Sequence, residues 1–379
     1  MKKSDCVKKI YLVGGSVRDK LLNLPNHDKD YVAVGYDERD FSHLPKVGKN
    51  FPVFLLPDSS QIALARRETK IAKGYNGFCY QTAQVTLQED LKRRDLTINA
   101  MAFDEENQIL IDPFKGQKDL KQKILRHTSE AFNQDPLRVL RIARFRAKFG
   151  KEWKIHPSTK TLISSMKEEL TSLEPNRVYQ EIQKVLALPQ SYLFFETLFE
   201  LDILEILFPS LAEQPSFTYA MARLKNLPKT PKTLKLAALY LDKSSLFKNT
   251  PESFKDMQIP KKTQKPMLLL IFNHAQIHNL AQMQPSEILD FFESYRGQIQ
   301  LFKMQIQLFL SQQATQTSFT KGFATPNFPL YSNLFISLQK LSPKKWIDSK
   351  AKPPSADSIK KYLHRAKINR IKSALKLRP

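Results

Sequence analysis

Two kinds of hydrophobic pattern divide the chain. Short apolar runs rich in β-branched and aromatic residues, such as Ile10–Val13 and Tyr31–Val34, lie in the first 150 residues together with eight of the ten glycines. From about Asp135 onward, Leu, Ile and Phe recur at three- and four-residue spacing, as in residues 137–149 and 191–208. The first pattern indicates strands and turns, and the second indicates helices. The sequence therefore predicts an α+β N-terminal part followed by an all-helical part.

The helical part contains two expected interruptions and ends in a basic segment. Residues 213–232 and 312–329 are rich in proline or polar residues and are expected to interrupt the helices. The last 29 residues, 351–379, hold nine Lys or Arg and one Asp, with apolar residues at helical spacing. This pattern predicts one or two basic amphipathic helices. Their basic face is either solvated or in contact with an RNA backbone, and a membrane-surface helix is less favoured without bulky aromatics.

Length and charge narrow the class of protein. A chain of 379 residues suggests two to three domains. It carries 60 Lys and Arg against 37 Asp and Glu, a net charge of +23 that favours a polyanionic partner, nucleic acid first. Two cysteines, Cys6 and Cys79, cannot build a disulfide framework, and residues 266–272 form too short an apolar run to span a membrane. We expect a soluble, reduced, cytoplasmic protein.

The strongest local signal lies in residues 11–35. An apolar run ends at Gly14 and Gly15, where a backbone free of side chains could approach a phosphate, and Arg18 adds positive charge. Asp28 and Asp30 follow at the start of the next apolar run. Residues two apart on a strand point to one face, so their carboxylates would repel each other unless a cation such as Mg²⁺ lay between them.

A second signal lies in residues 135–145. Asp135, Arg138, Arg141 and Arg144 recur every third residue, while apolar residues occupy most other directions of the expected helix. Three arginines on a largely buried helix need anionic partners. Those partners are either a bound anion in a cleft or Asp and Glu side chains of neighbouring helices.

Five motifs in order resemble the class II tRNA nucleotidyltransferases, that is, the CCA-adding enzymes and their poly(A) polymerase relatives in the polymerase β-like superfamily. The likeness is strongest to the gamma-proteobacterial type of CCA-adding enzyme. The matching residues are Leu12 to Asp19 with Asp28 to Asp30; Arg93 to Ala100; Asp112, Pro113, Gly116 and Asp119; Asp135, Pro136, Arg138, Leu140, Arg141, Arg144 and Phe145; and Arg177, Val178 and Glu181. One departure is Gln134, where the family usually has Glu.

The resemblance implies a fold and a division of the chain. It implies a polymerase β-like nucleotidyltransferase head with a mixed sheet at residues 1–125 and a helical neck at 126–188. A helical body at 189–311 and a basic helical tail at 312–379 would follow, the tail binding tRNA. The stretch 71–80, with two glycines and aromatics, is similar to the mobile loop of the family's head.

The resemblance also implies an activity: template-independent addition of CCA to the 3′ end of tRNA from CTP and ATP, with release of pyrophosphate. Asp28 and Asp30 would be catalytic and would hold two Mg²⁺ ions. The implied nucleotide-binding residues are Gly15, Arg18, Arg94, Asp135, Arg138, Arg141 and Arg144. The expected partners are the acceptor–T arm and 3′ end of tRNA, with neither DNA nor a membrane among them.

Hydrogen bonding explains how the implied residues could select the base. In the family, the positions of Asp135 and Arg138 pair with the edge of the incoming base. Cytosine and adenine both present an amino donor beside a ring-nitrogen acceptor, which an Asp acceptor and an Arg donor match, whereas guanine and uracil present the reverse. A pair of side chains could thus select C and A without a template.

Two departures and several alternatives stay open. The gamma-proteobacterial relatives carry a phosphohydrolase region with two His-Asp pairs, and here these pairs read Leu241–Asp242 and His274–Ala275, so no phosphatase or phosphodiesterase activity is expected. No third catalytic carboxylate is evident. The alternatives are a poly(A) polymerase, an enzyme that adds only A or only CC, and, from another class, an inactive basic RNA-binding protein.

Overall fold

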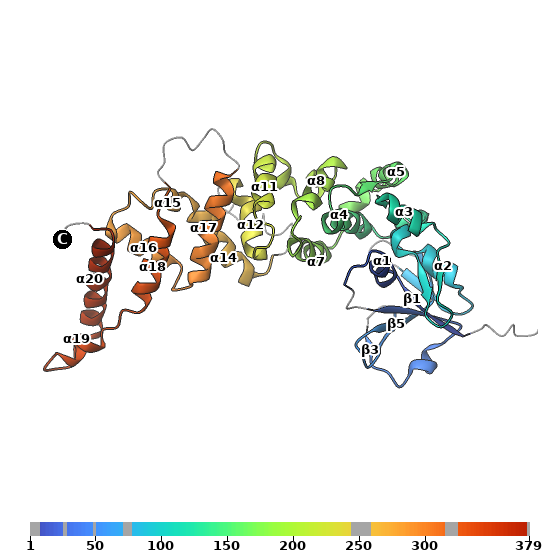
Figure 1. Cartoon of the computed structure of the whole chain (residues 1–379), viewed down its shortest axis with the longest axis horizontal. Coiled ribbons are helices and arrows are strands. Elements are labelled where there is room, and N and C mark those ends of the chain that lie inside the picture. Colours follow the sequence, from blue (N-terminus) through green and yellow to red (C-terminus); the bar gives the residue numbers. More distant parts are fainter. Residues whose placement is uncertain are drawn as a thin grey trace, which may run out of the picture. The chain divides into compact units, whose positions relative to one another are not determined.

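A computed structural model of the chain describes residues 8–25, 29–47, 51–70, 78–243, 259–314 and 325–376. The chain forms two compact units, Met1–Glu181 with Leu193–Leu207 and Ile182–Tyr192 with Phe208–Pro379. Strands lie in the first unit, and helices make up the second (Figure 1). The predicted α+β head followed by helices is confirmed. The finer division into head, neck, body and tail stays a prediction.

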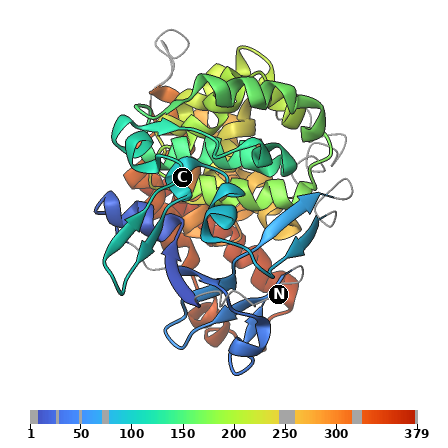
Figure 2. The same cartoon turned by 90° about the vertical axis from the view of Figure 1, so that its right-hand side faces the viewer.

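A mixed sheet forms the centre of the first unit. Its strands are β1 (Lys9–Val13), β2 (Asp30–Val34), β3 (Lys46–Val47), β4 (Val53–Leu55), β5 (Gln61–Leu64), β8 (Ala102–Asp104) and β9 (Ile109–Ile111). They lie side by side in the order β3-β4-β5-β2-β1-β8-β9 (Figure 2). Only β2 and β5 run parallel, with Asp30 opposite Gln61, and the other pairs are antiparallel. The predicted strands β1 and β2 are thus neighbours at the middle of the sheet.

Successive residues of a strand point to opposite faces of the sheet, so this sheet has two apolar faces. Each face packs against a helix. Val13 and Val32 pack with Leu91 of helix α2 (Leu87–Lys92) in one cluster. Leu12 packs with Val17 of helix α1 (Gly15–Leu21) in another. Helix α1, which follows β1 directly, is therefore packed against the sheet.

The rest of the first unit consists of short elements around the sheet. They are η1 (Glu38–Phe41), the hairpin β6 (Arg67–Lys70) with β7 (Phe78–Gln81), η2 (Thr97–Asn99), α3 (Gly116–Gln122), the parallel pair β10 (Ile124–Leu125) with β11 (Lys154–Ile155), η3 (Glu130–Gln134), α4 (Leu137–Phe149), α5 (Pro157–Ser165), α6 (Lys167–Leu170), α7 (Pro175–Leu186), α8 (Tyr192–Glu200) and α9 (Leu204–Leu207). Helix α7 continues into the second unit.

Helix α4 differs in one respect from the prediction. It begins at Leu137, so Asp135 precedes it in an extended conformation and is not part of its arginine stripe. Pro136 explains this, because a residue before proline is disfavoured in the helical region. Leu137, Val139 and Ile142 are among its buried residues, as the apolar pattern predicts.

The second unit is helical throughout its described part. Its elements are α10 (Pro209–Ala212), α11 (Ser216–Lys225), α12 (Lys232–Tyr240), η4 (Leu241–Lys243), α14 (Lys261–Phe272), α15 (His274–His278), α16 (Pro285–Ser294), α17 (Ile299–Gln313), α18 (Phe328–Gln339), α19 (Lys344–Asp348) and α20 (Ala356–Ala374). Phe292, Phe302 and Phe335 form the centre of a large aromatic core, with ring centroids 5.2–5.3 Å apart. Among the described residues, no helix has both the length and the apolar character to cross a membrane.

Two sequence predictions for this unit have different outcomes. The expected break at 213–232 is wrong, because helix α11 lies within it and buries Phe217, Met221 and Leu224. The prolines of that stretch instead flank the helix. The predicted basic amphipathic helix at the C-terminus is confirmed as α20, which buries Ile371 against the aromatic core.

Candidate active site

The Gly14 turn joins β1 to α1 and brings two elements of the predicted site together. Gly14 has a φ of +71°, which L-residues rarely adopt, and its N–H donates to the Met101 carbonyl at 3.2 Å. A Cβ on Gly14 would lie 2.8 Å from Nη1 of Arg94. Next along the turn, Oγ of Ser16 accepts a hydrogen bond from the N–H of Asp30 at 3.2 Å. Both Asp30 and Arg94 therefore border this turn.

Asp30 is the one member of the predicted metal pair that can be placed. Its side chain is exposed at the start of β2, where a cation could reach the carboxylate. Asp28 lies outside the described residues. In the neighbouring strand, the residue opposite Asp30 is Gln61, an amide, so this position offers no third carboxylate. Elsewhere in the described part of the chain, no three His, Cys, Asp or Glu side chains gather as a metal site.

Arg94 is oriented by the end of helix α2. Its Nη2 donates to Oδ2 of Asp90 at 3.1 Å, while its buried Nε–H has no acceptor among the described residues. A buried N–H of a guanidinium without an acceptor is costly, and water or an anionic ligand must satisfy it. This donor set fits a negatively charged group of a nucleotide.

Arg18 is buried in the interior of the first unit. It is only 4% exposed, and it donates to the side chains of Asn99 and Asp19. Its guanidinium carbon lies 5.2 Å from the ring centroids of Phe145 and Phe149 in α4. Arg18 thus connects α1 to α4, and its predicted contact with a nucleotide stays a prediction. Gly15 lies beside it, since a Cβ there would be 3.3 Å from Nη2 of Arg18.

Asp95 anchors Arg141 from the centre of the unit. Its Oδ2 accepts from Nε of Arg141 at 2.8 Å, and its Oδ1 accepts from Nδ2 of Asn99 at 2.9 Å. Burial opposes the charged form, but the charge of Arg141 and the hydrogen bond from Asn99 outweigh it and hold the pKa of Asp95 well below its usual range. The negative charge of Asp95 in turn raises the pKa of Arg141.

The residues expected to select the base are held by other protein groups. Asp135 accepts hydrogen bonds from Arg177 at 3.0 and 3.3 Å. Arg138 donates from Nη1 to the Ala131 carbonyl and from Nη2 to the Arg93 carbonyl, each at 2.7 Å. Both side chains are therefore oriented by fixed neighbours.

Arg144 completes the helix stripe. Its Nε donates to Oε2 of Glu181 at 2.6 Å. With Arg141 bound to Asp95, two of the three stripe arginines have carboxylate partners within the protein. These two arginines therefore form ion pairs with carboxylates of other elements, and their predicted contact with a nucleotide stays a prediction. Arg177 and Glu181 belong to the fifth motif, which is the signal that could have placed them near the stripe.

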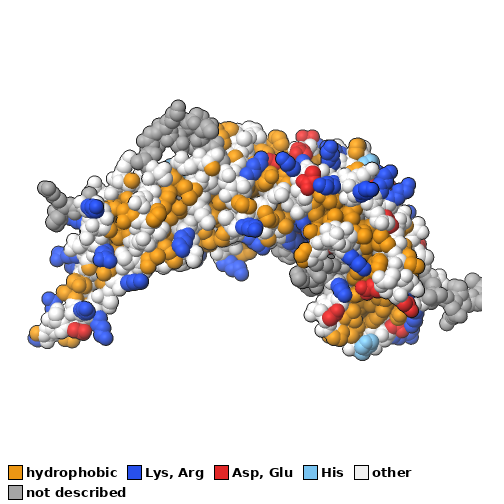
Figure 3. All heavy atoms as spheres, in the orientation of Figure 1, with side chains coloured by type: hydrophobic (Ala, Val, Ile, Leu, Met, Phe, Trp, Pro, Cys, Tyr) orange, Lys and Arg blue, Asp and Glu red, His pale blue; other side chains and the backbone are white. Residues whose placement is uncertain are grey.

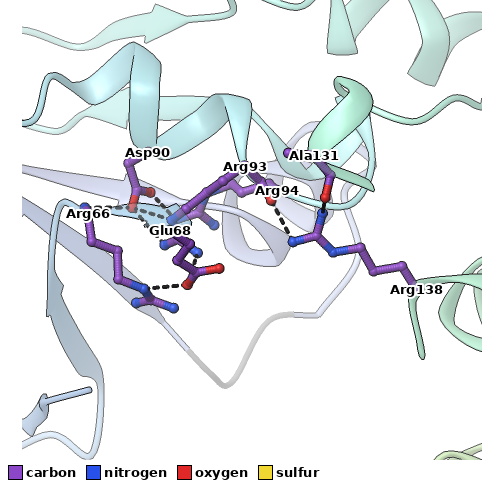
Figure 4. A network of polar contacts seen from close by, with 7 residues as sticks. All are labelled: Arg66, Glu68, Asp90, Arg93, Arg94, Ala131 and Arg138. Carbon is purple, nitrogen blue, oxygen red and sulfur yellow. Dashed lines mark hydrogen bonds and ion pairs between the residues drawn. The ribbon is translucent and has the colours of Figure 1, made fainter. Parts of the chain in front are cut away.

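A polar network beside Arg138 has no counterpart in the sequence-based prediction. Asp90 is fully buried and accepts from the Arg66 N–H at 3.2 Å, from Arg93 at 2.7 and 3.0 Å and from Arg94 (Figure 4). Burial alone would raise the pKa of Asp90, but the charges of Arg93 and Arg94 lower it to about 2. Glu68 accepts from Nε of Arg66 at 2.6 Å and from Nη1 of Arg93 at 3.1 Å.

A cavity of about 620 Å³ borders this network. Its lining residues come from the hairpin, from α2 and from η3, and they are Arg67, Glu68, Glu89, Lys92, Arg93, Ser129, Glu130 and Ala131. The cavity therefore adjoins two groups that hold Arg138 in place, namely Arg93 and Ala131.

The second unit holds the two altered His-Asp pairs. Asp242 is bound by the fully buried guanidinium of Arg223, whose Nε also donates to the Ala238 carbonyl at 2.9 Å. Nε2 of His274 contacts Oε1 of Gln312 and lies 3.3 Å from Nε2 of His278. Asp242 is thus satisfied by an arginine, and the expected absence of phosphohydrolase activity stays a prediction.

His274 gives a prediction about stability. Burial is the main cause that lowers its pKa to about 4; His278 and Arg223 add to this, while Gln312 and Asp242 oppose it. The unfolded chain takes up a proton near pH 6.5 but the folded chain only near pH 4, so stability is full above pH 6.5 and falls as the pH drops toward 4. We expect a loss of about 3 kcal/mol across that window.

The measurement is amide hydrogen exchange of peptides from α15 and α17 at pH 7, 5.5 and 4.5, corrected for intrinsic rates. In a His274→Gln protein the acid-dependent part of the opening free energy should shrink, because glutamine does not titrate; burial also lowers the pKa of His278, which would account for the part that remains. Equal pH dependence in the two proteins would contradict this assignment.

Comparisons with known proteins agree with the head and with the segment after it. Residues 10–126 match the family model "Poly A polymerase head domain", and residues 153–214 match the model "Probable RNA and SrmB-binding site of polymerase A". The chain is 45% identical over 244 residues to a CCA-adding enzyme of Blochmanniella pennsylvanica, covering 62% of this chain and 60% of the relative. It is 48% identical over 233 residues to that of Coxiella burnetii, covering 60% and 61%. The matches span about three fifths of the length of these relatives.

A solved structure extends the likeness to the fold of nearly the whole chain. The apo form II of a CCA-adding enzyme aligns with 97% of this chain and 90% of its own, with a TM-score of 0.69 and 23% sequence identity. At 23% sequence identity, this alignment shows a shared fold and nothing about activity. The resemblance inferred from the five motifs is confirmed by the sequence matches: residues 10–126 match the poly A polymerase head-domain family, and 60–62% of the chain is similar to CCA-adding enzymes.

Proposed function

We propose that the protein adds CCA to the 3′ end of tRNA, using CTP and ATP without a nucleic-acid template. The observation that carries the proposal is that one turn, Gly14 to Ser16, is bordered by both the exposed Asp30 and Arg94 with its unsatisfied Nε–H. In each step the RNA 3′-hydroxyl would attack the α-phosphorus of the nucleotide, and pyrophosphate would leave. The proton of the hydroxyl passes to solvent.

A divalent cation belongs to this chemistry. Enzymes of the head-domain family generally depend on divalent metal, and we propose Mg²⁺ as the ion, held by Asp28 and Asp30. Carboxylate oxygens are the ligands that Mg²⁺ prefers. When bound, Mg²⁺ would neutralise charge on the reacting phosphates. Arg94 would bind the triphosphate from the other side of the turn.

Base selection would use Asp135 and Arg138. Arg177 holds the carboxylate, and the carbonyls of Ala131 and Arg93 hold the guanidinium, so little reordering is needed when a base arrives. An acceptor beside a donor matches the edges of cytosine and adenine. Arg141 and Arg144, held by Asp95 and Glu181, would stand near the nucleotide; Gly15 and Arg18 would support it from the turn.

The partner we propose is the acceptor–T arm of tRNA. Helix α20 carries six Lys and Arg and one Asp, and Figure 3 shows Lys and Arg side chains exposed over α19 and α20. Such surfaces bind the phosphate backbone and would grip tRNA by its shape. The work would be divided among a head (1–125), a neck (126–188), a body (189–311) and a tail (312–379), with the cytoplasm as the location.

One assay tests the proposal and separates the alternatives. Purified protein is given tRNAs that end before CCA, after C and after CC, with each of the four nucleotides singly and in pairs. Addition of C, C and A followed by a stop supports the proposal. Runs of A would indicate a poly(A) polymerase, a product ending at CC or formed only from the CC substrate would indicate a partial activity, and no addition would indicate an RNA-binding protein.

A further inference from the structure

Glu68 is part of the hairpin and contacts the network that holds Arg138, the arginine proposed to select the base. It belongs to β6, and its Oε1 binds both Arg66 of the same strand and Arg93 at the end of α2. Figure 4 shows its carboxylate between Arg66 and the side of the network where Arg138 enters. The side chain is 18% exposed and lines the cavity of about 620 Å³. Glu68 is thus reachable from this cavity.

Arg93 links Glu68 to Arg138, because its side chain contacts Glu68 and its backbone carbonyl contacts Arg138. Its side chain is held by Glu68 and Asp90, and its backbone carbonyl accepts the hydrogen bond from Nη2 of Arg138. The charges of Glu68 and Arg138 also lie close enough for each to affect the pKa of the other. A change at Glu68 can therefore affect Arg138 in two ways: through the contacts of Arg93, and through the electric field of the Glu68 carboxylate.

Glu68 supplies one of the two negative charges in a network that contains more arginines than carboxylates. Figure 4 contains four arginines, Arg66, Arg93, Arg94 and Arg138, and two carboxylates, Glu68 and Asp90. Asp90 is fully buried and accepts hydrogen bonds from the guanidinium groups of Arg93 and Arg94 and from the backbone N–H of Arg66. If Glu68 lost its charge, Arg66 and Arg93 would keep only Asp90 of these two carboxylates, and the repulsion between the two arginines would rise. Arg138 would keep the charges of Asp95 and Asp135 but would lose that of Glu68.

We propose that Glu68 is a positioning residue for nucleotide selection: it fixes Arg93 and thereby the orientation in which Arg138 meets the incoming base. Glu68 itself makes no hydrogen bond to the base in this account. The inference rests on the proposed function, since it deepens the role given there to Arg138. It concerns selectivity and leaves the reacting groups at Asp30 and Arg94 untouched.

The test is a Glu68→Gln protein, assayed with CTP and UTP on tRNA that ends before CCA. We expect KM for CTP to rise and the ratio of kcat/KM for CTP over UTP to fall at least about fivefold, which is the low end of one lost bidentate match. Saturated kcat with CTP should stay within about threefold. The matched control is Glu89→Gln: Glu89 lines the same cavity, and its carboxylate pairs with Arg67 and caps α2 at Thr86. The ratio of this variant should equal that of the wild type.

Unchanged selectivity in a folded Glu68→Gln protein would overturn the proposal, as would an equal loss of kcat for both nucleotides. If Glu68→Gln fails to fold, Glu68→Asp keeps the charge and withdraws the carboxylate by one methylene, and it should give a smaller drop in the ratio; no drop would again overturn the proposal. A wild-type protein that adds no C refutes the proposed function instead. In that case, equilibrium dialysis with CTP and UTP still tests Glu68, because binding preference needs no turnover.

Discussion

An Asp30→Asn protein is expected to add nucleotides at least about a thousandfold more slowly than the wild type, while its affinity for ATP changes little. Asparagine keeps the shape of the side chain but removes the charge that would attract a divalent cation, and charge stabilisation by metal is worth several kcal/mol in phosphoryl transfer. Affinity should survive because Asp90 holds Arg94, the Ala131 carbonyl holds Arg138 and Arg177 holds Asp135, and asparagine at position 30 leaves these contacts in place.

The measurement is single-nucleotide addition of A to tRNA ending in CC, beside equilibrium dialysis with ATP. Asp37→Asn is the control: Asp37 is an exposed head residue that caps η1, a role that asparagine also fills. Asp28→Asn is expected to behave as Asp30→Asn does, on the sequence argument alone. Retained turnover in both Asp28→Asn and Asp30→Asn would remove the metal assignment.

Gly14→Ala is expected to lower kcat/KM about a hundredfold. Alanine at a φ of +71° is strained, and its Cβ would lie 2.8 Å from Nη1 of Arg94, so the guanidinium must move away from the turn. A displacement of about 1 Å in a group that positions a substrate can cost about a hundredfold in rate. Thermal unfolding of the same protein separates this effect from a loss of fold.

Gly15→Ala provides the comparison. Gly15 has no positive φ, and its Cβ would approach Arg18 only to 3.3 Å, so we expect a clearly smaller loss than for Gly14→Ala. If Gly14→Ala instead kept wild-type kcat/KM, Arg94 would not belong to the nucleotide site. The pair therefore tests the close approach of Arg94, apart from the mere presence of glycine in the turn.

The sequence predicted the features that depend on neighbours along the chain. Strands β1 and β2 and helix α4 follow from apolar patterns within a dozen residues, and the glycine turn and Asp30 occupy the ends of those strands. One local detail was missed, although its signal was present: Pro136 moves the start of α4 to Leu137 and leaves Asp135 outside the helix.

Pairings between distant segments were beyond such patterns. The resemblance assigned Arg18 to the nucleotide site, but no local pattern indicated that Arg18 would also contact Asn99 and the rings of Phe145 and Phe149. The sequence did not indicate that Glu68 would meet Arg93, 25 residues away, because neither residue stands out in composition or spacing. Buried charges choose whichever opposite charge the folded chain brings near, and periodicity carries no information about that choice.

By itself, then, the sequence determined the class of fold, the order of its parts and the motif residues at the sheet, since these follow from local periodicity and turn chemistry. The tertiary structure alone decided which carboxylate holds which arginine: Asp95 holds Arg141, Glu181 holds Arg144 and Arg177 holds Asp135. The physical reason is that a buried ion must be paired, and its partner is fixed by the packing of segments that are far apart in the chain.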